Sequence, residues 1–344
     1  METRVVGREE WRAAEAAHER RVDAATQTHR TRRREGRAHP VEDFLFTYYR
    51  FRPAQLRRWH PGAGVVLEAT GGMPRAGWRF YAPVRGARVG DGVALDVAAY
   101  LLERGVTVRF VRDLLAATAA RPPQLGCFGL HEWAMVYRLT PGEVRHAGWP
   151  LRLGAAGTNE VVESHQIRCT HYDAFRFYTP PARSLNLLQP RRETQAALEQ
   201  PGCLHAGMDC YKWAFKLAPA IPSELVMDCF DLAREIRELD MRAAPYDLRE
   251  LGYEPVRIET PEGKAEYVRA QRGFAERSQR LRHRLVAECD RLLAELHAES
   301  AQPRPSPPQP SPPRPSLPPP SLRHPSLPHT LLSHPDAATA TDRC

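Results

Sequence analysis

Four polar residues in one short stretch have the types and the spacing that acid–base catalysis requires. The stretch "PGCLHAGMDCYKWAFKLAP" (201–219) contains His205, Asp209, Lys212 and Lys216, at steps that place them on one side of a helix. An amine can have its pKa lowered and can attack carbon, whereas a guanidinium does neither. The chain has only three lysines among its 49 basic residues, so we predict that Asp209 and Lys212 are catalytic. The alternative is a solvated face stabilised by charge pairs.

Two further segments supply candidates for acid–base chemistry. The alternation in "HQIRCTHYDAFRFY" (165–178) predicts a strand, with His171 and Asp173 on the same face. A carboxylate there can orient the imidazole or act as a general base, and an Asp–His pair at a sheet edge is the alternative. In "GCFGLHEWAMVYR" (126–138), Glu132 opens a predicted helix, where the helix dipole alone already favours it.

The same three segments each pair a cysteine with a histidine. Thiolate sulfur and imidazole nitrogen are ligands of zinc and iron. The spacing is not a standard ligand spacing, and the chain contains no CxxC or HxxxH. We therefore expect no cofactor, and keep a zinc or iron site as the alternative, with these ligands: Cys127, His131, Cys169, His171, Cys203 and His205.

The basic residues suggest a polyanionic partner. The net charge is +8, and arginines gather in "HRTRRREGR" (29–37) and in "YRFRPAQLRRWHPG" (49–62). Arginine binds phosphate, and aromatic rings stack on unstacked bases. The alternative is a coding bias that favours arginine. The predicted nucleic-acid contacts are Arg32, Arg33, Arg34, Arg57 and Arg58, with Trp133, Trp213 and Tyr172 as stacking rings.

Periodicity indicates the elements that position these residues. Apolar residues at helical spacing predict helices at 7–34, 42–50, 91–119, 131–139, 208–217, 223–243 and 262–298. Alternation predicts strands at 64–69, 77–84 and 165–178. Because Gly207 weakens a helix, the helix of the lysine stretch is expected to begin near Met208. The sum is a mostly helical α+β fold with a small sheet and a long C-terminal helix.

Composition divides the chain into three parts. We predict a basic N-terminal helix (1–37), a globular α+β domain (38–300) and a disordered tail (301–344). The stretch from Pro303 to Pro335 holds 14 of the 32 prolines, which cannot build a helix or a sheet. Such a tail can dock weakly on polyproline-binding modules or be passive.

Several protein classes are excluded or disfavoured. No run of about 18 apolar residues exists, so no membrane span is expected. The N-terminus is charged throughout and lacks the apolar core of a secretion signal. The seven cysteines have no disulfide-framework spacing, which favours reduced thiols and a cytoplasmic location.

Several motifs resemble a known family over roughly residues 38–250. The motifs are "HPVEDFLFTYYRFRPAQLRRWHPG", "GCFGLHEWAMVY", "RCTHYDAFRFYTPPARSLN", "QPGCLHAGMDCYKWAFKLAP" and "PSELVMDCFDLAREIRELDMRAAPYDL". They resemble a bacterial family labelled 3-methyladenine DNA glycosylase, although the chain lacks a helix-hairpin-helix signature. The resemblance implies a hydrolase that removes alkylated bases from damaged DNA in base excision repair.

That chemistry needs a carboxylate, because cleavage of the N-glycosidic bond builds positive charge on the sugar. Asp209 and Asp173 are the two candidates. Two alternatives remain open: a metal-dependent enzyme that uses the Cys/His pairs, and a nucleic-acid-binding protein without catalysis.

Overall fold

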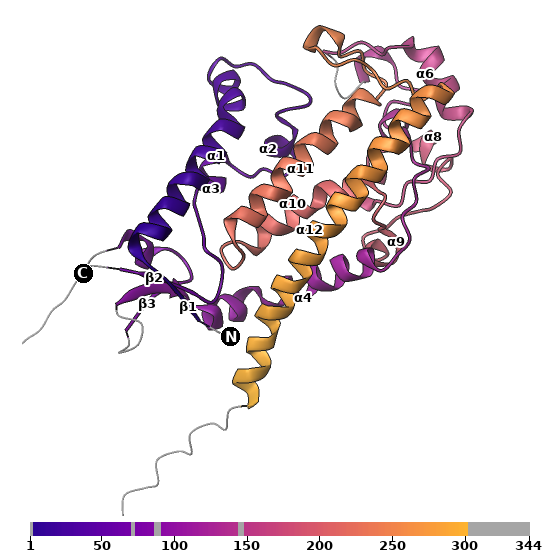
Figure 1. The fold of residues 1–344 in the computed structure, drawn as a ribbon. Helices are drawn as coiled ribbons and strands as arrows, with labels where there is room; N and C mark the ends of the chain where they lie inside the picture. Colours follow the sequence, from indigo (N-terminus) through magenta and orange to yellow (C-terminus); the bar gives the residue numbers. More distant parts are fainter. Residues whose placement is uncertain (1–2, 70–72, 86–90, 144–147, 302–344) are drawn as a thin grey trace, which may run out of the picture. The chain divides into compact units, whose positions relative to one another are not determined.

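The predicted fold class is confirmed. The computed structural model describes residues 3–69, 73–85, 91–143 and 148–301, and it is mostly helical with a small mixed sheet and a long C-terminal helix (Figure 1). The tail predicted to be disordered lies outside the described residues from 302 onward. Among the described residues, none of the helices is apolar over the length that a bilayer requires.

The elements follow one another in this order: β1 (Arg4–Val6), α1 (Arg8–Arg34), α2 (Phe44–Tyr48), α3 (Pro53–Leu56), β2 (Val65–Glu68), the 3₁₀ turn η1 (Pro74–Gly77), β3 (Tyr81–Val84), β4 (Gly92–Leu95), α4 (Val97–Ala119), α5 (Leu130–Ala134), η2 (Pro141–Glu143), α6 (Gly154–Glu163), α7 (Tyr172–Phe175), α8 (Pro180–Arg183), α9 (Gln195–Leu198), α10 (Leu204–Leu217), α11 (Ser223–Arg242), η3 (Arg249–Leu251) and α12 (Pro261–Ala301).

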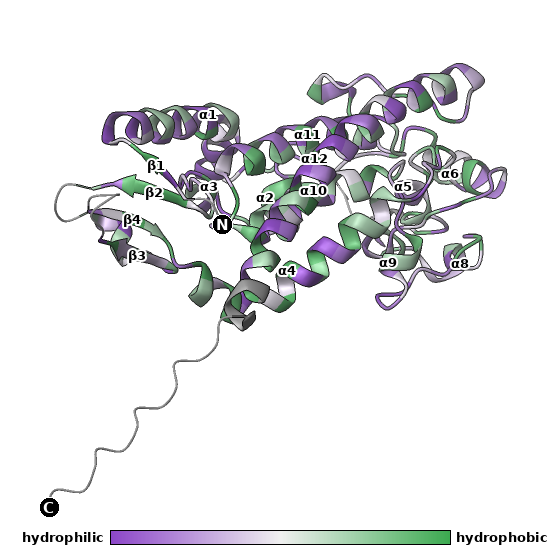
Figure 2. Cartoon of the chain, turned by 60° about the horizontal axis from the view of Figure 1, so that its bottom comes forward, coloured by the Kyte–Doolittle hydropathy of each residue, from purple (hydrophilic) through white to green (hydrophobic). Residues whose placement is uncertain are grey.

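Helix α10 lies at the centre of the helical layer. It packs against α11 and α12, and α12 also runs along α4 (Figure 1). Helix α11 fits this place because its apolar residues recur at steps of four and three and are buried: Leu225, Cys229, Leu232, Ile236 and Leu239. By contrast, α1 is mostly hydrophilic (Figure 2) and buries only a few side chains against α11 and β2. The predicted N-terminal helix thus packs onto the domain that follows it.

The sheet is small and mixed, with the strand order β1-β2-β4-β3. Strand β1 pairs parallel with β2, and the other pairs are antiparallel. Strands β2 and β3 lie inside the predicted segments 64–69 and 77–84. Strand β1 was not predicted, because a run of three residues is too short to show a period. Strand β4 was missed because its residues, Gly92–Leu95, were predicted as the start of the helix at 91–119.

The predicted strand at 165–178 is wrong. Within it, Ile167 forms an isolated bridge with Asn186, and the chain then turns into helix α7. The Nδ1 of His171 accepts a hydrogen bond from the backbone N–H of Ala174, at 3.3 Å, and so caps this helix. A local capping bond therefore prevailed over the alternating pattern.

Two predicted helices are shorter than expected. Those at 42–50 and 131–139 shrink to α2 and α5, and the chain beyond them reaches a left-handed residue, Arg50 (φ 59°) and Arg138 (φ 56°). A non-glycine residue with positive φ ends a right-handed helix. The predicted helix at 91–119 begins later, at Val97, because the side chain of Asp96 caps it.

Gly207 is a packing residue and not a helix start. Helix α10 begins at Leu204 and continues through Gly207, contrary to the prediction. A Cβ atom at Gly207 would lie 2.9 Å from the Oγ of Ser278 on α12 and 3.0 Å from the Cδ1 of Ile236 on α11. The absence of a side chain therefore allows the two neighbouring helices to approach α10.

We predict that Gly207→Ala destabilises the protein by about 1–3 kcal/mol, because the added methyl group forces α11 or α12 to shift. Gly273→Ala on α12 is the matched control, since its Cβ would meet nothing within 4 Å. The control should stabilise by about 0.5–1 kcal/mol through helix propensity. Urea unfolding of both variants measures this, and equal effects of the two substitutions would contradict the packing role of Gly207.

Candidate active site

The site is built around Asp209, whose side chain is only 3% exposed in the middle of α10. The hydroxyl of Tyr49 donates to its Oδ1 at 2.7 Å. The Nζ of Lys212 donates to its Oδ2 at 2.9 Å, and the Nε2 of His171 lies 3.3 Å from the same oxygen. A buried carboxylate is tolerated only when it is ion-paired and hydrogen-bonded, and these three partners come from three different segments.

Lys212 joins two carboxylates. Its Nζ also donates to the Oδ2 of Asp173 at 2.9 Å. Burial disfavours both charges, but the ammonium of Lys212 holds the pKa of Asp209 well below its usual range. The two carboxylates in turn raise the pKa of Lys212, against the effect of its burial. A compact ammonium can sit between two single oxygens, whereas a planar guanidinium fork fits two parallel acceptors.

His171 extends the cluster to Glu199. Because Nδ1 accepts from the backbone of Ala174, the proton of the neutral ring lies on Nε2, which faces Asp209 and stands 3.5 Å from the Oε1 of Glu199. Burial lowers the pKa of His171, but Asp209 and Glu199 outweigh it and raise this pKa. Burial also raises the pKa of Glu199, which accepts a hydrogen bond from Gln195 at 2.6 Å.

A second buried network lies beside the first. The Nε2 of His131 is 2.8 Å from the Oδ1 of Asp240 on α11. The Nη1 of Arg237 donates to the Oδ2 of Asp240 at 2.8 Å and to the Oε1 of Glu132 at 2.9 Å. Although burial opposes the charge, Asp240 raises the pKa of His131 well above its usual value. Burial raises the pKa of Asp240, but His131, His205 and Arg237 together outweigh burial and hold this pKa below the usual range.

His205 connects the two networks. Its ring centroid lies 4.4 Å from that of His131 and 5.3 Å from that of His171. Burial, reinforced by the charge of His131, lowers the pKa of His205 well below its usual value, so the ring is neutral. Its Nδ1 is buried and has no hydrogen-bond partner within the described part of the chain.

A cavity of about 470 Å³ opens onto these networks. Its wall contains three aromatic rings, from Phe44, Tyr48 and Phe177, and four of the polar side chains described above, from Glu132, Asp173, His205 and Arg237. Asp209 does not line it. The side chain of Asp173 is 26% exposed, so Asp173 and not Asp209 is the carboxylate of the Lys212 cluster that a molecule in the cavity can reach.

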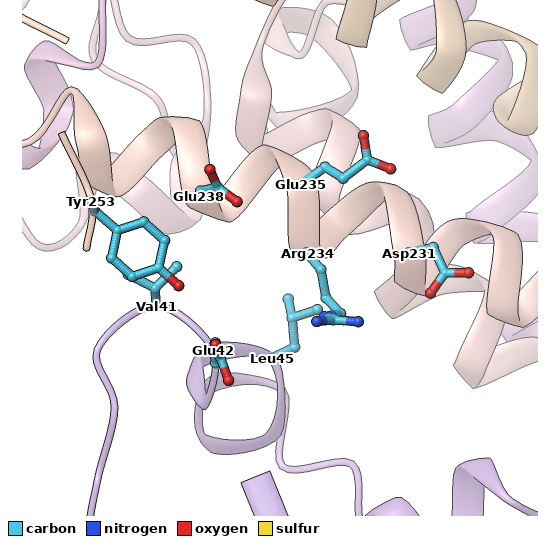
Figure 3. Close-up of a pocket in the computed structure, with 8 residues that line it drawn as sticks. All are labelled: Val41, Glu42, Leu45, Asp231, Arg234, Glu235, Glu238 and Tyr253. Carbon is cyan, nitrogen blue, oxygen red and sulfur yellow. The ribbon is translucent and has the colours of Figure 1, made fainter. Parts of the chain in front are cut away.

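Another cavity, of about 450 Å³, lies between α11 and the segment that leads into α2 (Figure 3). Its polar lining consists of Glu42, Asp231, Arg234, Glu235, Glu238 and Tyr253. It contains no predicted catalytic residue and no histidine or cysteine. We therefore take the cavity beside His205 as the candidate site.

The five predicted catalytic residues come together in the structure. Asp209, Lys212, Asp173 and His171 form one contact cluster, and Glu132 lies on the wall of the same cavity. Their geometry differs from the prediction in one respect. Only His205 of the predicted polar face of α10 reaches the cavity, while Lys216 is exposed. The prediction missed Tyr49, Glu199, Arg237 and Asp240.

Two of the arginines predicted to contact nucleic acid form ion pairs with acidic residues of this chain. Arg32 is ion-paired with Glu42 and Asp43. Arg57 is ion-paired with Glu19 in the same way. These two arginines stabilise the packing of α1. The structure therefore does not favour their predicted role as phosphate ligands.

The predicted stacking rings differ in exposure. Trp133 is buried, and its Nε1 donates to the carbonyl of Ala243. Trp213 is also buried, so neither indole can stack on a base without rearrangement. The remaining predicted contacts have exposed or partly exposed side chains: Arg33, Arg34, Arg58 and Tyr172.

The alternative prediction was a metal site made of cysteines and histidines. The predicted histidines belong to two groups of potential ligands among the described residues, but the predicted cysteines belong to neither group. The described residues hold two groups whose ligand atoms lie within 4.8 Å of one another: His131, His205 and Asp240; and His171, Glu199 and Asp209. Among the cysteines, Cys127 has its Sγ 3.5 Å from the Nδ1 of His131. Burial raises the pKa of Cys169 to about 11, which keeps it a thiol at neutral pH.

No protein-family model, curated protein or solved structure matches the chain.

We predict that Lys212→Met destabilises the protein by about 3 kcal/mol or more, because it leaves the buried Asp209 without its cation. Lys216→Met is the control, since Lys216 is exposed, and it should change stability by no more than about 0.5 kcal/mol. Chemical unfolding measures both. Equal, small effects would mean that Lys212 is an ordinary surface lysine.

Acid should weaken the fold through the depressed carboxylates. The pKa values of Asp209 and Asp240 are lower in the folded chain than in the unfolded chain, so their stabilisation is present above the unfolded value of about 3.9. It is lost as the pH falls below that value. The free energy of unfolding, measured at a series of pH values from neutral to acidic, should fall as the pH falls. It should fall more steeply in the wild type than in Asp209→Asn. Equal slopes would contradict the assignment.

Proposed function

We propose that this protein is a DNA glycosylase that hydrolyses the N-glycosidic bond of an alkylated, cationic purine. The observation that supports this proposal is the position of Asp173 in the wall of an aromatic-lined cavity, held by two cations. Its Oδ2 accepts from Lys212 at 2.9 Å, and its Oδ1 lies 3.2 Å from the Nε of Arg176. A fixed, ion-paired carboxylate is what a developing positive charge on a sugar requires.

The cavity offers aromatic rings together with charges of both signs. Phe44, Tyr48 and Phe177 supply aromatic faces, and the guanidiniums of Arg237 and Arg176 lie over the rings of Phe44 and Phe177. The carboxylates of Asp173 and Glu132 stand at the same wall as these arginines. In this proposal, a base flipped out of the duplex stacks on the aromatic rings, and Asp173 attracts its positive charge.

In the proposed reaction, the bond between C1′ of the sugar and the ring nitrogen breaks, and the electron pair leaves with the base. This neutralises the positive charge of the base, so no acid is needed for its departure. Asp173 stabilises the charge that develops on C1′ and accepts a proton from the water that adds there. The proton passes to solvent, and the products are the free base and an abasic sugar with a hydroxyl group at C1′.

The buried residues act as positioning groups in this proposal. Asp209 and Asp173 share the ammonium of Lys212 at 2.9 Å each, so Asp209 fixes where that ammonium stands and hence where Asp173 stands. His171 and Tyr49 hold Asp209 from other sides. This assigns the carboxylate of α10 a supporting role, in place of the catalytic role expected from the sequence.

DNA is the proposed partner, and the exposed arginines of the basic segments would contact its phosphates. Arg33, Arg34 and Arg58 are exposed, and Arg50 lies at the cavity itself. The six described cysteines are free thiols, which supports a cytoplasmic location for such an enzyme.

We predict that Asp173→Asn lowers the release of 3-methyladenine from methylated duplex DNA by about 100-fold or more, since it removes the charge and the base while keeping the shape. Asp247→Asn is the control, because Asp247 is a surface carboxylate paired with Arg249, and it should release the base at the wild-type rate. Chromatography of the released base measures the rate, and binding to undamaged DNA is measured separately.

Full activity of Asp173→Asn would overturn the assigned role of this carboxylate. Wild-type protein that binds DNA but releases no base would identify a nucleic-acid-binding protein without glycosylase activity.

A further inference from the structure

Two imidazoles and a carboxylate from three helices converge beside the cavity. The Nε2 of His131 on α5, a ring nitrogen of His205 on α10 and an oxygen of Asp240 on α11 all lie within 4.8 Å of one another. Nitrogen and oxygen ligands at about 2.0–2.2 Å from a metal ion stand roughly 3–4 Å apart. The 2.8 Å between His131 and Asp240 is near the short end of this geometry, so a small movement admits an ion.

The neighbours orient two of these ligands. The Sγ of Cys127 lies 3.5 Å from the Nδ1 of His131, which directs the other ring nitrogen, Nε2, toward Asp240. Arg237 engages the Oδ2 of Asp240 and leaves its Oδ1 to face His131. Groups of this kind, which hold the far atom of each ligand, are typical of metal sites in proteins.

The environment of His205 is not explained by a hydrogen-bond network alone. Its Nδ1 is buried and has no hydrogen-bond partner among the described residues, although the ring lies against His131 and lines the cavity. Buried polar atoms in folded proteins nearly always have a partner. A bound ion beside the ring would fix its orientation and allow the second ring nitrogen to reach a water molecule.

We propose that His131, His205 and Asp240 bind one divalent transition-metal ion, of the class of iron(II) or zinc, at the wall of the cavity. Two histidines and one carboxylate on one side of an ion leave its other positions open for water or for a ligand in the cavity. The inference goes beyond the proposed glycosylase and does not depend on it, because hydrolysis through Asp173 uses no ion.

The neighbouring group of His171, Glu199 and Asp209 does not carry the same inference. In both groups a carboxylate is paired with a buried cation, Asp209 with Lys212 and Asp240 with Arg237. The groups differ in their histidines: the Nδ1 of His171 accepts from Ala174, whereas the Nδ1 of His205 has no hydrogen-bond partner among the described residues and its ring lines the cavity. This difference makes the two groups a matched pair for a test.

The test titrates metal-free full-length protein with cobalt(II), whose visible absorption reports ligation by nitrogen and oxygen. We expect about one equivalent of cobalt to bind per chain, with protons released as it binds. His205→Ala should weaken binding by at least about 100-fold, as loss of a ligand exceeds loss of an outer neighbour. Cys127→Ala should weaken it by about 10–100-fold.

Two control variants should bind cobalt as tightly as the wild type does if the proposal is right. His165→Ala removes another partly buried histidine with an unpaired ring nitrogen, and Glu199→Gln alters the second group. Circular dichroism and melting curves establish that each variant is folded. His205→Ala should fold, because the Nδ1 of His205 makes no hydrogen bond to any described residue. Folded wild-type protein that binds no cobalt or zinc overturns the proposal, as does binding that His205→Ala leaves intact or that Glu199→Gln abolishes.

Discussion

The buried carboxylate of Asp209 is the constraint on which the site depends. An isolated charge in a protein interior costs several kcal/mol, and its partners must be in place for the helix that carries it to be buried. Tyr49 follows α2, His171 caps α7, and Lys212 lies one turn along α10. Burying α10 between α11 and α12 therefore brings these separate segments to one point, so the packing of the core and the assembly of the site are the same event.

Periodicity predicted the long helices well and the short elements poorly. Helices α1, α11 and α12 span several turns, so their apolar stripes stand out from the sequence. The chain leaves the predicted helix after α2 through a single backbone conformation, at Arg50, which composition does not reveal because arginine seldom has positive φ. The segment around His171 alternated like a strand, but a side-chain cap made it a helix.

The site was predictable where its residues are close in sequence. The Cys–His pairs and the spacing of α10 marked His131, His171 and His205. Glu199 and Asp240 were missed because their contacts are distant in sequence, as between His131 and Asp240, which are 109 residues apart. One signal was available: Arg237 and Asp240 lie on the apolar side of α11, where charged residues are buried only if paired.

The charges of the two networks explain why the protonation of the site should depend on whether a metal ion is bound there. Five carboxylates gather there, on Glu132, Asp173, Glu199, Asp209 and Asp240, against the buried cations Lys212 and Arg237 and the exposed Arg176. The remaining negative charge needs protons or a metal ion. Protons on the imidazoles and an ion bound to them compete for the same lone pairs, so an ion that enters must displace protons. The net charge of such a site therefore depends on pH, whether the site holds protons or a metal ion.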